Sequence, residues 1–350
     1  MPNLVHLLNH RPGGGVESVV ECLVEDAVAR GESVRVAVLN PVVRPSPVLE
    51  ASRVDVVRCS AHGWNRVRGF MLPVSAMGLT PEAQGLFQWA DVIQAHHPLA
   101  QAVGARLARA YGTRLVAHVH NMGEAWMNPR GIVPWLFARE VRRGLRAADQ
   151  VLCVGEAVRQ ALIQVIPDVA DRAIVQLNPL PAWLTSLTQS LAPQYDVVVV
   201  GRLDEQKNSA FAAEVVCRWA AAHPSGRVAI VGEGPLASDV DAIRARYGVT
   251  DRVVRLGWLP RPEAVAVMAD SRVLFQPSRY EGSPITVREA LTLGLRVVAS
   301  NIPPHLELAE TDSRVWLAPA DGFGATELLA HAIVASRDQQ NSPDHPGSII

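Results

Sequence analysis

The alternation of short apolar runs with longer amphipathic stretches is the feature that most limits how this chain can fold. Runs such as Leu4–Leu8 are rich in branched apolar residues and are short enough for strands, whereas Val16–Arg30 carries apolar residues at helical spacing. This alternation is typical of βα units, which close into parallel sheets with helices on both faces. We therefore predict an α/β fold.

The alternation occurs in two series. The first predicts strands at 4–8, 34–39, 54–58, 92–95, 115–120, 150–154 and 173–176. The second predicts strands at 196–200, 227–231, 253–256, 273–276, 296–299 and 314–317. The segment between them is rich in Pro, Ser, Thr and Gln, as linkers are. We predict an N-terminal domain at 1–185, a linker at 186–194, a C-terminal domain at 195–338 and a disordered tail at 339–350.

Composition narrows the class of protein. Apolar residues make up 49% and charged residues 19% of the chain, with a formal net charge of −1, which is typical of a soluble globular protein and disfavours a nucleic-acid partner. The sequence has no secretory signal pattern and no apolar run that could span a bilayer. Scattered cysteines without a Cys-x-x-Cys pair argue against a zinc site and disulfides, and we predict a cytoplasmic protein. These cysteines are Cys22, Cys59, Cys153 and Cys217.

A glycine turn at Gly13, Gly14 and Gly15 separates the first predicted strand from a helix. Backbone amides at such a helix start can hold a phosphate, although the same glycines also suit an ordinary tight turn. The pattern is not Gly-x-Gly-x-x-Gly, and no acidic residue plainly ends the second strand. Dinucleotide binding is therefore poorly supported.

Two loops of the second series follow strands at the carboxyl edge, where open α/β sheets collect ligands. Arg202 and Lys207 lie on the first loop, and a guanidinium beside an ammonium suits a diphosphate. Two solvated surface cations are the alternative interpretation. Gly232 and Gly234 form a tight turn after the next strand, where backbone can approach a ligand closely.

The segment 276–294 is the most informative. A strand ends at Gln276, a loop rich in Gly and Ser follows, and a helix is predicted to begin near Pro284. Glu281 precedes this helix and Glu289 lies within it. Carboxylates accept hydrogen bonds from sugar hydroxyls, and amides at a helix start bind phosphate. Alternatively, these residues are an ordinary helix-start acid and a surface acid.

Together these motifs resemble the family 4 glycosyltransferases of the GT-B fold, a retaining group. The most specific part is Pro-Ser-x-x-Glu-Gly-x-Pro-x-x-x-x-Glu-Ala at 277–290, and Gly294, Leu256-Gly257 and Glu307 follow the family's order. The resemblance spans nearly the whole chain. It implies two Rossmann-like domains with parallel sheets facing a central cleft, the first on the acceptor side and the second on the nucleotide-sugar donor side.

The resemblance also implies roles for individual residues. It gives a catalytic set of Arg202, Lys207, His120 and Glu281, with His118 as the runner-up for the histidine. It gives donor contacts from Gly14, Gly15, Gly232, Gly234, Gly282, Ser283, Pro284, Ile285 and Glu289. The cations would bind the donor diphosphate, Glu289 the ribose and Glu281 the transferred sugar. No metal and no cofactor are implied, since the nucleotide diphosphate sugar is a co-substrate.

We therefore predict a hexosyltransferase-type retaining glycosyltransferase. It would move a sugar to a hydroxyl of a glycan, lipid-linked or small-molecule acceptor in cell-surface polysaccharide or glycoconjugate biosynthesis. A nucleotide-sugar epimerase on a related fold is one alternative. A catalytically inactive accessory protein is another, because no long closing segment follows the helix predicted at 325–337.

Arginines and large apolar residues gather at 64–72 and 126–146. Such surfaces can rest on the anionic inner face of the cytoplasmic membrane and meet a lipid-linked acceptor. An amphipathic helix packed on its sheet explains the same residues equally well.

Overall fold

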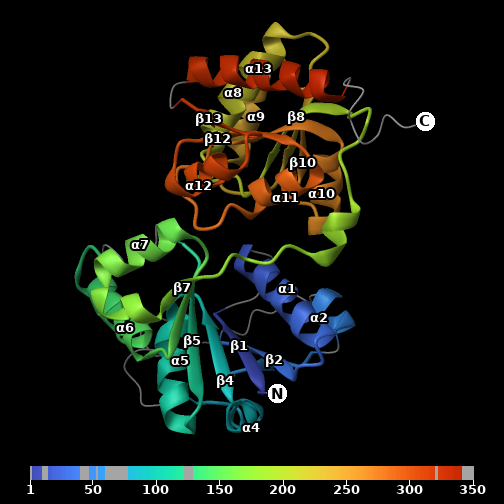
Figure 1. The fold of residues 1–350 in the computed structure, drawn as a ribbon. Helices are drawn as coiled ribbons and strands as arrows, with labels where there is room; N and C mark the ends of the chain where they lie inside the picture. The colour runs from blue at the N-terminus through green and yellow to red at the C-terminus, as the bar shows by residue number, and fades with distance from the viewer. Residues whose placement is uncertain are drawn as a thin grey trace. The chain divides into compact units, whose positions relative to one another are not determined.

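The computed structural model describes residues 2–9, 15–39, 47–52, 54–59, 78–121, 129–319 and 322–340. The chain divides into two compact units, Met1–Pro179 and Leu180–Ile350. Each unit is built on one parallel sheet with helices on both of its faces (Figure 1). Among the described residues, no helix combines the length and apolarity needed to cross a membrane.

The sheet of the first unit has seven strands in the order β3-β2-β1-β4-β5-β6-β7. Because the order reverses between β1 and β4, their carboxyl ends form the topological switch point where such sheets bind ligands. In chain order the elements are β1 (Leu4–Leu8), α1 (Gly15–Ala29), β2 (Val34–Val38), α2 (Pro47–Ala51), β3 (Val56–Arg58), α4 (Pro81–Trp89), β4 (Val92–His96), α5 (Pro98–Tyr111), β5 (Arg114–Val119), α6 (Ile132–Ala147), β6 (Gln150–Cys153), α7 (Glu156–Val165), η2 (Pro167–Arg172) and β7 (Ala173–Val175).

The sheet of the second unit has six strands in the order β10-β9-β8-β11-β12-β13, with its switch point between β8 and β11. Helices α8, α9 and α13 cover one face, and α10, α11 and α12 cover the other. In chain order the elements are η3 (Ala182–Ser186), β8 (Tyr195–Val200), α8 (Ser209–Ala222), β9 (Val228–Val231), α9 (Ala237–Arg246), β10 (Val253–Gly257), α10 (Arg261–Ala269), β11 (Ser271–Gln276), α11 (Ile285–Leu293), β12 (Arg296–Ser300), α12 (Pro303–Thr311), β13 (Val315–Ala318) and α13 (Gly322–Gln340).

Every run predicted as a strand overlaps an observed strand, and the prediction of parallel α/β sheets is confirmed. The units divide at Pro179, whereas the sequence placed the linker at 186–194. That segment belongs to the second unit, because the backbone N–H of Gln189 donates to Leu293 and that of Ser190 to Ala269. Its polar composition gave no sign of these bonds. Of the predicted tail, 339–340 continue α13 and 341–350 lie outside the described residues.

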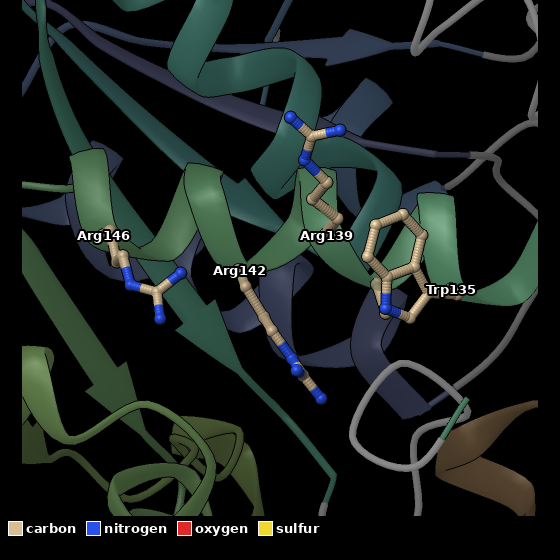
Figure 2. A pocket seen from close by; sticks show the side chains of 5 residues that line it. Trp135, Arg139, Arg142 and Arg146 are labelled. Atoms are coloured by element: carbon tan, nitrogen blue, oxygen red, sulfur yellow. The ribbon is translucent and has the colours of Figure 1, made fainter.

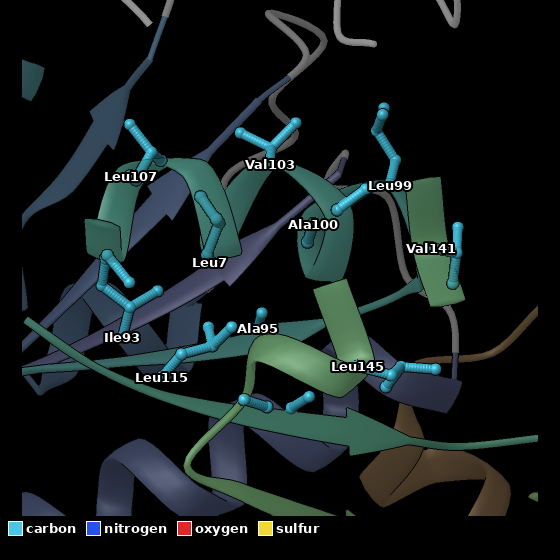
Figure 3. Close-up of a cluster of buried hydrophobic side chains, with 14 of the residues drawn as sticks. Leu7, Ile93, Ala95, Leu99, Ala100, Val103, Leu107, Leu115, Val141 and Leu145 are labelled. Carbon is cyan, nitrogen blue, oxygen red and sulfur yellow. The ribbon is translucent and has the colours of Figure 1, made fainter. Parts of the chain in front are cut away.

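Helices α5 and α6 pack closely in the core of the first unit. Figure 3 shows Leu99 and Val103 of α5 gathered with Leu115 of β5 and Leu145 of α6 in one buried cluster. Gly144 permits this approach, because a Cβ atom at that position would lie 2.6 Å from the carbonyl oxygen of Gln101. A backbone atom cannot move aside as the end of a flexible side chain can, so the helix spacing requires glycine here.

We predict that Gly144→Ala destabilises the protein by about 1–3 kcal/mol, the usual effect of overpacking a core. Gly85→Ala is the matched control, since Gly85 is an exposed position of α4 and a Cβ there would meet no atom within 4 Å. It should stabilise the protein by roughly 0.5–1 kcal/mol, because alanine loses less backbone entropy in a helix. Urea denaturation compares the two, and equal stabilities would mean that Gly144 does not set the spacing.

Candidate active site

Asp204 organises the loop that follows β8. Its carboxylate accepts a hydrogen bond of 2.9 Å from the backbone N–H of Lys207 and one of 2.5 Å from Nε of Arg202. Its own backbone N–H donates to the hydroxyl of Ser209 at 3.0 Å, where α8 begins. Asp204 therefore fixes the loop that carries both predicted cations. Sequence reasoning missed this residue, although an aspartate three positions before Lys207 was a signal for such a turn.

Lys207 and Glu281 join the loops after β8 and β11. Nζ of Lys207 lies 2.6 Å from Oε1 of Glu281, and the two side chains are 24% and 6% exposed. The backbone N–H of Arg279 also donates to the carbonyl of Gln206 at 2.8 Å. Because β8 and β11 are parallel neighbours, their carboxyl-end loops lie side by side. The structure thus brings two of the predicted catalytic residues together, while the Arg202 side chain is 69% exposed.

His305 is a buried residue near this pair that sequence reasoning missed. Its Nδ1 donates to the carbonyl of Ser300 at 2.9 Å, and the Ser300 hydroxyl donates to the carbonyl of Ser278 at 2.5 Å. Burial lowers the pKa of His305; Glu281 opposes the shift, whereas Lys207 adds to it. Its Nε2 is buried without a hydrogen-bond partner within the described ranges. The only signal for His305 in the sequence was its position after Pro303 and Pro304, one strand beyond the motif at 277–290.

Glu289 pairs with a different cation. Nε and Nη2 of Arg261, the first residue of α10, lie 2.7 and 2.6 Å from its Oε1. Burial raises the pKa of Glu289, and the Arg261 guanidinium lowers it. The two glutamates of the 277–290 motif therefore have separate partners, Lys207 for Glu281 and Arg261 for Glu289. The alternative that Glu289 is a surface acid is wrong, since its side chain is only 7% exposed.

The predicted glycines have backbone reasons to be glycine. Gly232 has φ of +138°, and a Cβ there would lie 1.9 Å from the carbonyl oxygen of Gly201. A Cβ at Gly234 would lie 2.3 Å from the carbonyl oxygen of Leu203. The loops after β8 and β9 therefore lie too close together for a side chain at either position. Packing alone requires glycine at both residues, whatever else they touch.

The four residues 282–285 form the start of α11. Pro284 is the N-cap of this helix, and the backbone N–H of Ile285 donates to the carbonyl of Ser283 at 2.8 Å. Gly282 is buried beside Glu281. The hydroxyl of Ser283 is buried and has no hydrogen-bond partner in the part of the chain that the structure describes.

An Asp-x-Asp pair, Asp239 and Asp241, lies on α9. Such pairs hold magnesium in some transferases, but here Asp241 is taken up by arginines. Its carboxylate accepts hydrogen bonds from Arg244 at 2.6 Å and from Arg255 at 2.9 Å. The Arg255 guanidinium also holds the pKa of Asp241 below its ordinary value. Asp241 therefore belongs to a structural ion network.

Four histidines of the first unit lie on one face of its sheet. His6 is on β1, His96 ends β4, His118 is on β5 and His120 follows β5. Nδ1 of His6 lies 3.0 Å from Nε2 of His96, and Nδ1 of His96 lies 3.0 Å from Nε2 of His120. Nε2 of His118 lies 3.0 Å from Oε1 of Gln94. The structure thus places the predicted His120 at the end of a buried histidine row.

The predicted glycine turn is described only in part. Gly14 lies outside the described residues, while Gly15 begins α1 with no atom within 4 Å of a Cβ position. Glu17 of α1 lies 3.4 Å from the ring of His97, and His97 adopts φ of +73° directly after β4.

His96, His118 and His120 are also the candidate metal ligands, since their ring nitrogens lie within 4.8 Å of one another. Their rings are stacked, however. The centroids of His96 and His118 are 4.2 Å apart at an interplanar angle of 28°, and the planes of His118 and His120 differ by 10°. Imidazole binds a metal in its own ring plane, so rings stacked this way do not converge on one ion.

Known protein families account for both units. Residues 13–181 match the model named Glycosyltransferase Family 4, and residues 194–336 match Glycosyl transferases group 1. The chain belongs to this glycosyltransferase family. The resemblance drawn from the sequence motifs is confirmed.

The chain also resembles individual members. It is 30% identical over 233 residues to 2-deoxystreptamine glucosyltransferase of Streptomyces kanamyceticus, covering 61% of this chain and 60% of that one. It is 27% identical over 229 residues to an Escherichia coli UDP-Gal:alpha-D-GlcNAc-diphosphoundecaprenol alpha-1,3-galactosyltransferase, covering 61% and 58%. The chain thus matches less than two thirds of the length of each relative.

Among solved structures, that of Anabaena HepE in complex with UDP and glucose superposes with a TM-score of 0.77. The two chains are 19% identical, and the match covers 99% of this chain and 94% of that one. The predicted GT-B class of fold is confirmed by this match. The individual roles assigned to site residues stay predictions.

We expect the histidine row to make the first unit sensitive to acid. Burial lowers the pKa of His6 to about 4 and that of His120 to about 3, and it lowers that of His96 well below its ordinary value. Because the folded state binds these protons less readily than the unfolded state, the stabilisation is complete above pH 6.5. It is lost as the pH falls toward the folded-state values.

We predict that the free energy of unfolding declines between pH 6.5 and pH 4 by up to about 1.4 kcal/mol per pH unit for each buried histidine. In His6→Asn the decline should be shallower by up to that amount, because one buried histidine no longer contributes. Urea denaturation across this pH range measures the slopes. His331→Asn, at an exposed position on α13, is the control, and identical slopes in wild type and His6→Asn would contradict the prediction.

Proposed function

We propose that this protein is a retaining glycosyltransferase that moves a sugar from a nucleotide diphosphate sugar to an acceptor hydroxyl. The observation that carries the proposal is the shielded pair of Lys207 and Glu281 at the switch point of the second sheet. Family membership supports it, as does the similarity to HepE, whose structure holds UDP and glucose.

Lys207 and Arg202 supply the charge that a departing nucleotide diphosphate requires. Positive groups held in advance of the reaction stabilise negative charge as it develops on the leaving phosphate. Lys207 is held by its backbone bond to Asp204 and by Glu281. The Arg202 side chain is 69% exposed although Asp204 is buried, so the guanidinium is free to turn from this carboxylate to phosphate oxygens.

The two glutamates bind the donor through their second oxygens. Lys207 contacts Oε1 of Glu281, and both contacts from Arg261 reach Oε1 of Glu289. In each case Oε2 accepts hydrogen bonds from hydroxyls, those of the transferred sugar at Glu281 and those of the ribose at Glu289. In the first unit, His120 contacts the sugar or orients the acceptor, and the glycine turn at Gly14 and Gly15 approaches phosphate.

We predict that Lys207→Met lowers kcat/KM for sugar transfer by about 100-fold or more, the usual effect of removing one preorganised charge-stabilising group. Methionine keeps the length of the stem and removes only the ammonium. Arg246→Met is the matched control, because Arg246 is an exposed cation of the same unit that pairs with Glu214. Transfer and slow hydrolysis are followed with a panel of nucleotide sugars.

The same panel separates the alternatives. An epimerase would convert the sugar of the donor without an acceptor. An inactive accessory protein would show neither turnover nor stabilisation by any donor, since a ligand that binds the folded state raises its thermal stability. Full activity in Lys207→Met would overturn the proposed role of this lysine.

We further propose that α6 rests on an anionic phospholipid surface. Figure 2 shows Trp135, Arg139, Arg142 and Arg146 projecting from successive turns of this helix, where they line a surface pocket. The helix has four arginines against one glutamate, and its first turn exposes Ile132 by 76%. Tryptophan and arginine together suit the interface of an anionic bilayer.

The buried side of α6 and the acceptor of one relative both bear on this membrane proposal. The helix packs its other side on the first unit through Ala138, Val141 and Leu145, so the interpretation as a packed amphipathic helix also holds. The E. coli relative named above acts, by its name, on a diphosphoundecaprenol-linked sugar. A lipid-linked acceptor would give a reason for membrane contact. The other predicted segments, 64–72 and 126–128, lie outside the described residues.

We predict that the double variant Arg139→Gln/Arg146→Gln binds anionic vesicles about thirty-fold more weakly, since each cation near such a surface contributes about 1 kcal/mol. Co-sedimentation with phosphatidylserine vesicles at low salt measures the binding. Arg30→Gln/Arg109→Gln is the control, because it removes two exposed arginines from elsewhere in the same unit. Equal affinity of wild type for neutral phosphatidylcholine vesicles would contradict electrostatic docking.

A further inference from the structure

Three imidazoles of the first unit form one continuous hydrogen-bonded chain. His6 lies on β1, His96 ends β4 and His120 directly follows β5, and β1 pairs with β4 as β4 does with β5. Residues at alternate positions share a face of a sheet, and the register sets His6 opposite Gln94 and His96 opposite His118. The rings therefore meet across the sheet. Both hydrogen bonds join Nδ1 of one ring to Nε2 of the next at 3.0 Å.

Such a chain couples the tautomers of its members. A neutral imidazole has one N–H donor and one nitrogen acceptor, and each ring-to-ring bond needs one of each. If His6 donates from Nδ1, then His96 must carry its proton on Nδ1 and His120 must do the same. If His120 donates from Nε2, then all three rings carry the proton on Nε2. Any mixture of the two tautomers along the chain would place two N–H protons or two nitrogen lone pairs face to face in one of the bonds.

The rings are neutral at physiological pH, as this coupling requires. Burial lowers the pKa of His6 to about 4 and that of His120 to about 3, and the pKa of His96 lies well below its ordinary value. At the His120 end of the histidine chain, one ring nitrogen takes no part in these bonds. Nδ1 of His120 is buried and has no hydrogen-bond partner among the residues that the structure describes.

We propose that His6 and His96 are positioning residues that set the tautomer of His120, and so decide whether its Nδ1 donates or accepts a hydrogen bond. A change at His6, on β1, is thereby transmitted to Nδ1 of His120 through His96. The consequence for catalysis rests on the proposed function, in which His120 contacts the sugar or the acceptor. The tautomer coupling itself does not depend on that function.

His118 offers an internal control. Its ring stacks on His96 with centroids 4.2 Å apart, and it is as deeply buried, but its Nε2 bonds to Gln94 instead of joining the chain. Replacement of His118 by phenylalanine keeps the stacked ring and leaves the chain intact. Replacement of His6 by phenylalanine keeps the ring at that position but removes the bond to His96.

Nitrogen NMR of 15N-histidine-labelled protein tests the proposal, because the shifts of Nδ1 and Nε2 report which one carries the proton. In wild type without any sugar ligand, we expect His6, His96 and His120 to share one tautomer. In His6→Phe, the shifts of His96 and His120 should move toward the average of the two tautomers. In His118→Phe they should stay unchanged.

Two results would overturn the inference: different tautomers along the wild-type chain, or a tautomer of His120 unaffected in His6→Phe. Addition of one equivalent of Zn²⁺ distinguishes the metal interpretation, since joint shifts of His96, His118 and His120 would show a metal site instead of a chain. Activity adds a separate readout. If donor turnover fails in wild type while the NMR result holds, the proposed function is wrong and the coupling stands.

Discussion

The parallel pairing of β8 with β11 is the constraint on which the candidate site of the second unit depends. Loops at the carboxyl ends of neighbouring parallel strands emerge side by side, and at this point no crossover helix separates them. Residues 74 positions apart can therefore form the contact between Lys207 and Glu281. Gly232 and Gly234 serve the same arrangement, because their missing side chains let the loop after β9 press against the loop after β8.

The first unit uses the same geometry differently. Its switch point between β1 and β4 brings histidines together in place of an ion pair. Burial suppresses charge on these rings, so the interactions that remain are hydrogen bonds with a defined direction. An electrostatic site in one unit and a neutral, tautomer-coupled one in the other suit different tasks. Charge stabilises a departing diphosphate, whereas a neutral imidazole can donate to or accept from a hydroxyl.

Much of the fold was predictable, because strands buried on both faces leave continuous apolar runs that local sequence reveals. The motif at 277–290 also identified the family, and the predicted strand ends at 200 and 276 placed Lys207 and Glu281 at the carboxyl edge of one sheet. The structure divides the chain at Pro179, ahead of the predicted linker; the sequence could not show this, since the hydrogen bonds of Gln189 and Ser190 with the second unit involve backbone groups that every sequence possesses. Sequence reasoning missed Asp204 and His305 because their role is to hold neighbouring residues of the site in position.

The sequence by itself determined the α/β class, the positions of the strands along the chain and membership of the glycosyltransferase family, since these depend on local patterns and short motifs. Only the tertiary structure decided that Glu289 pairs with Arg261, that His305 lies near the Lys207 pair and that three histidines join in one chain. The physical reason is that such contacts depend on strand order, register and side-chain rotamer together. None of these is encoded within the few residues around any one of the partners.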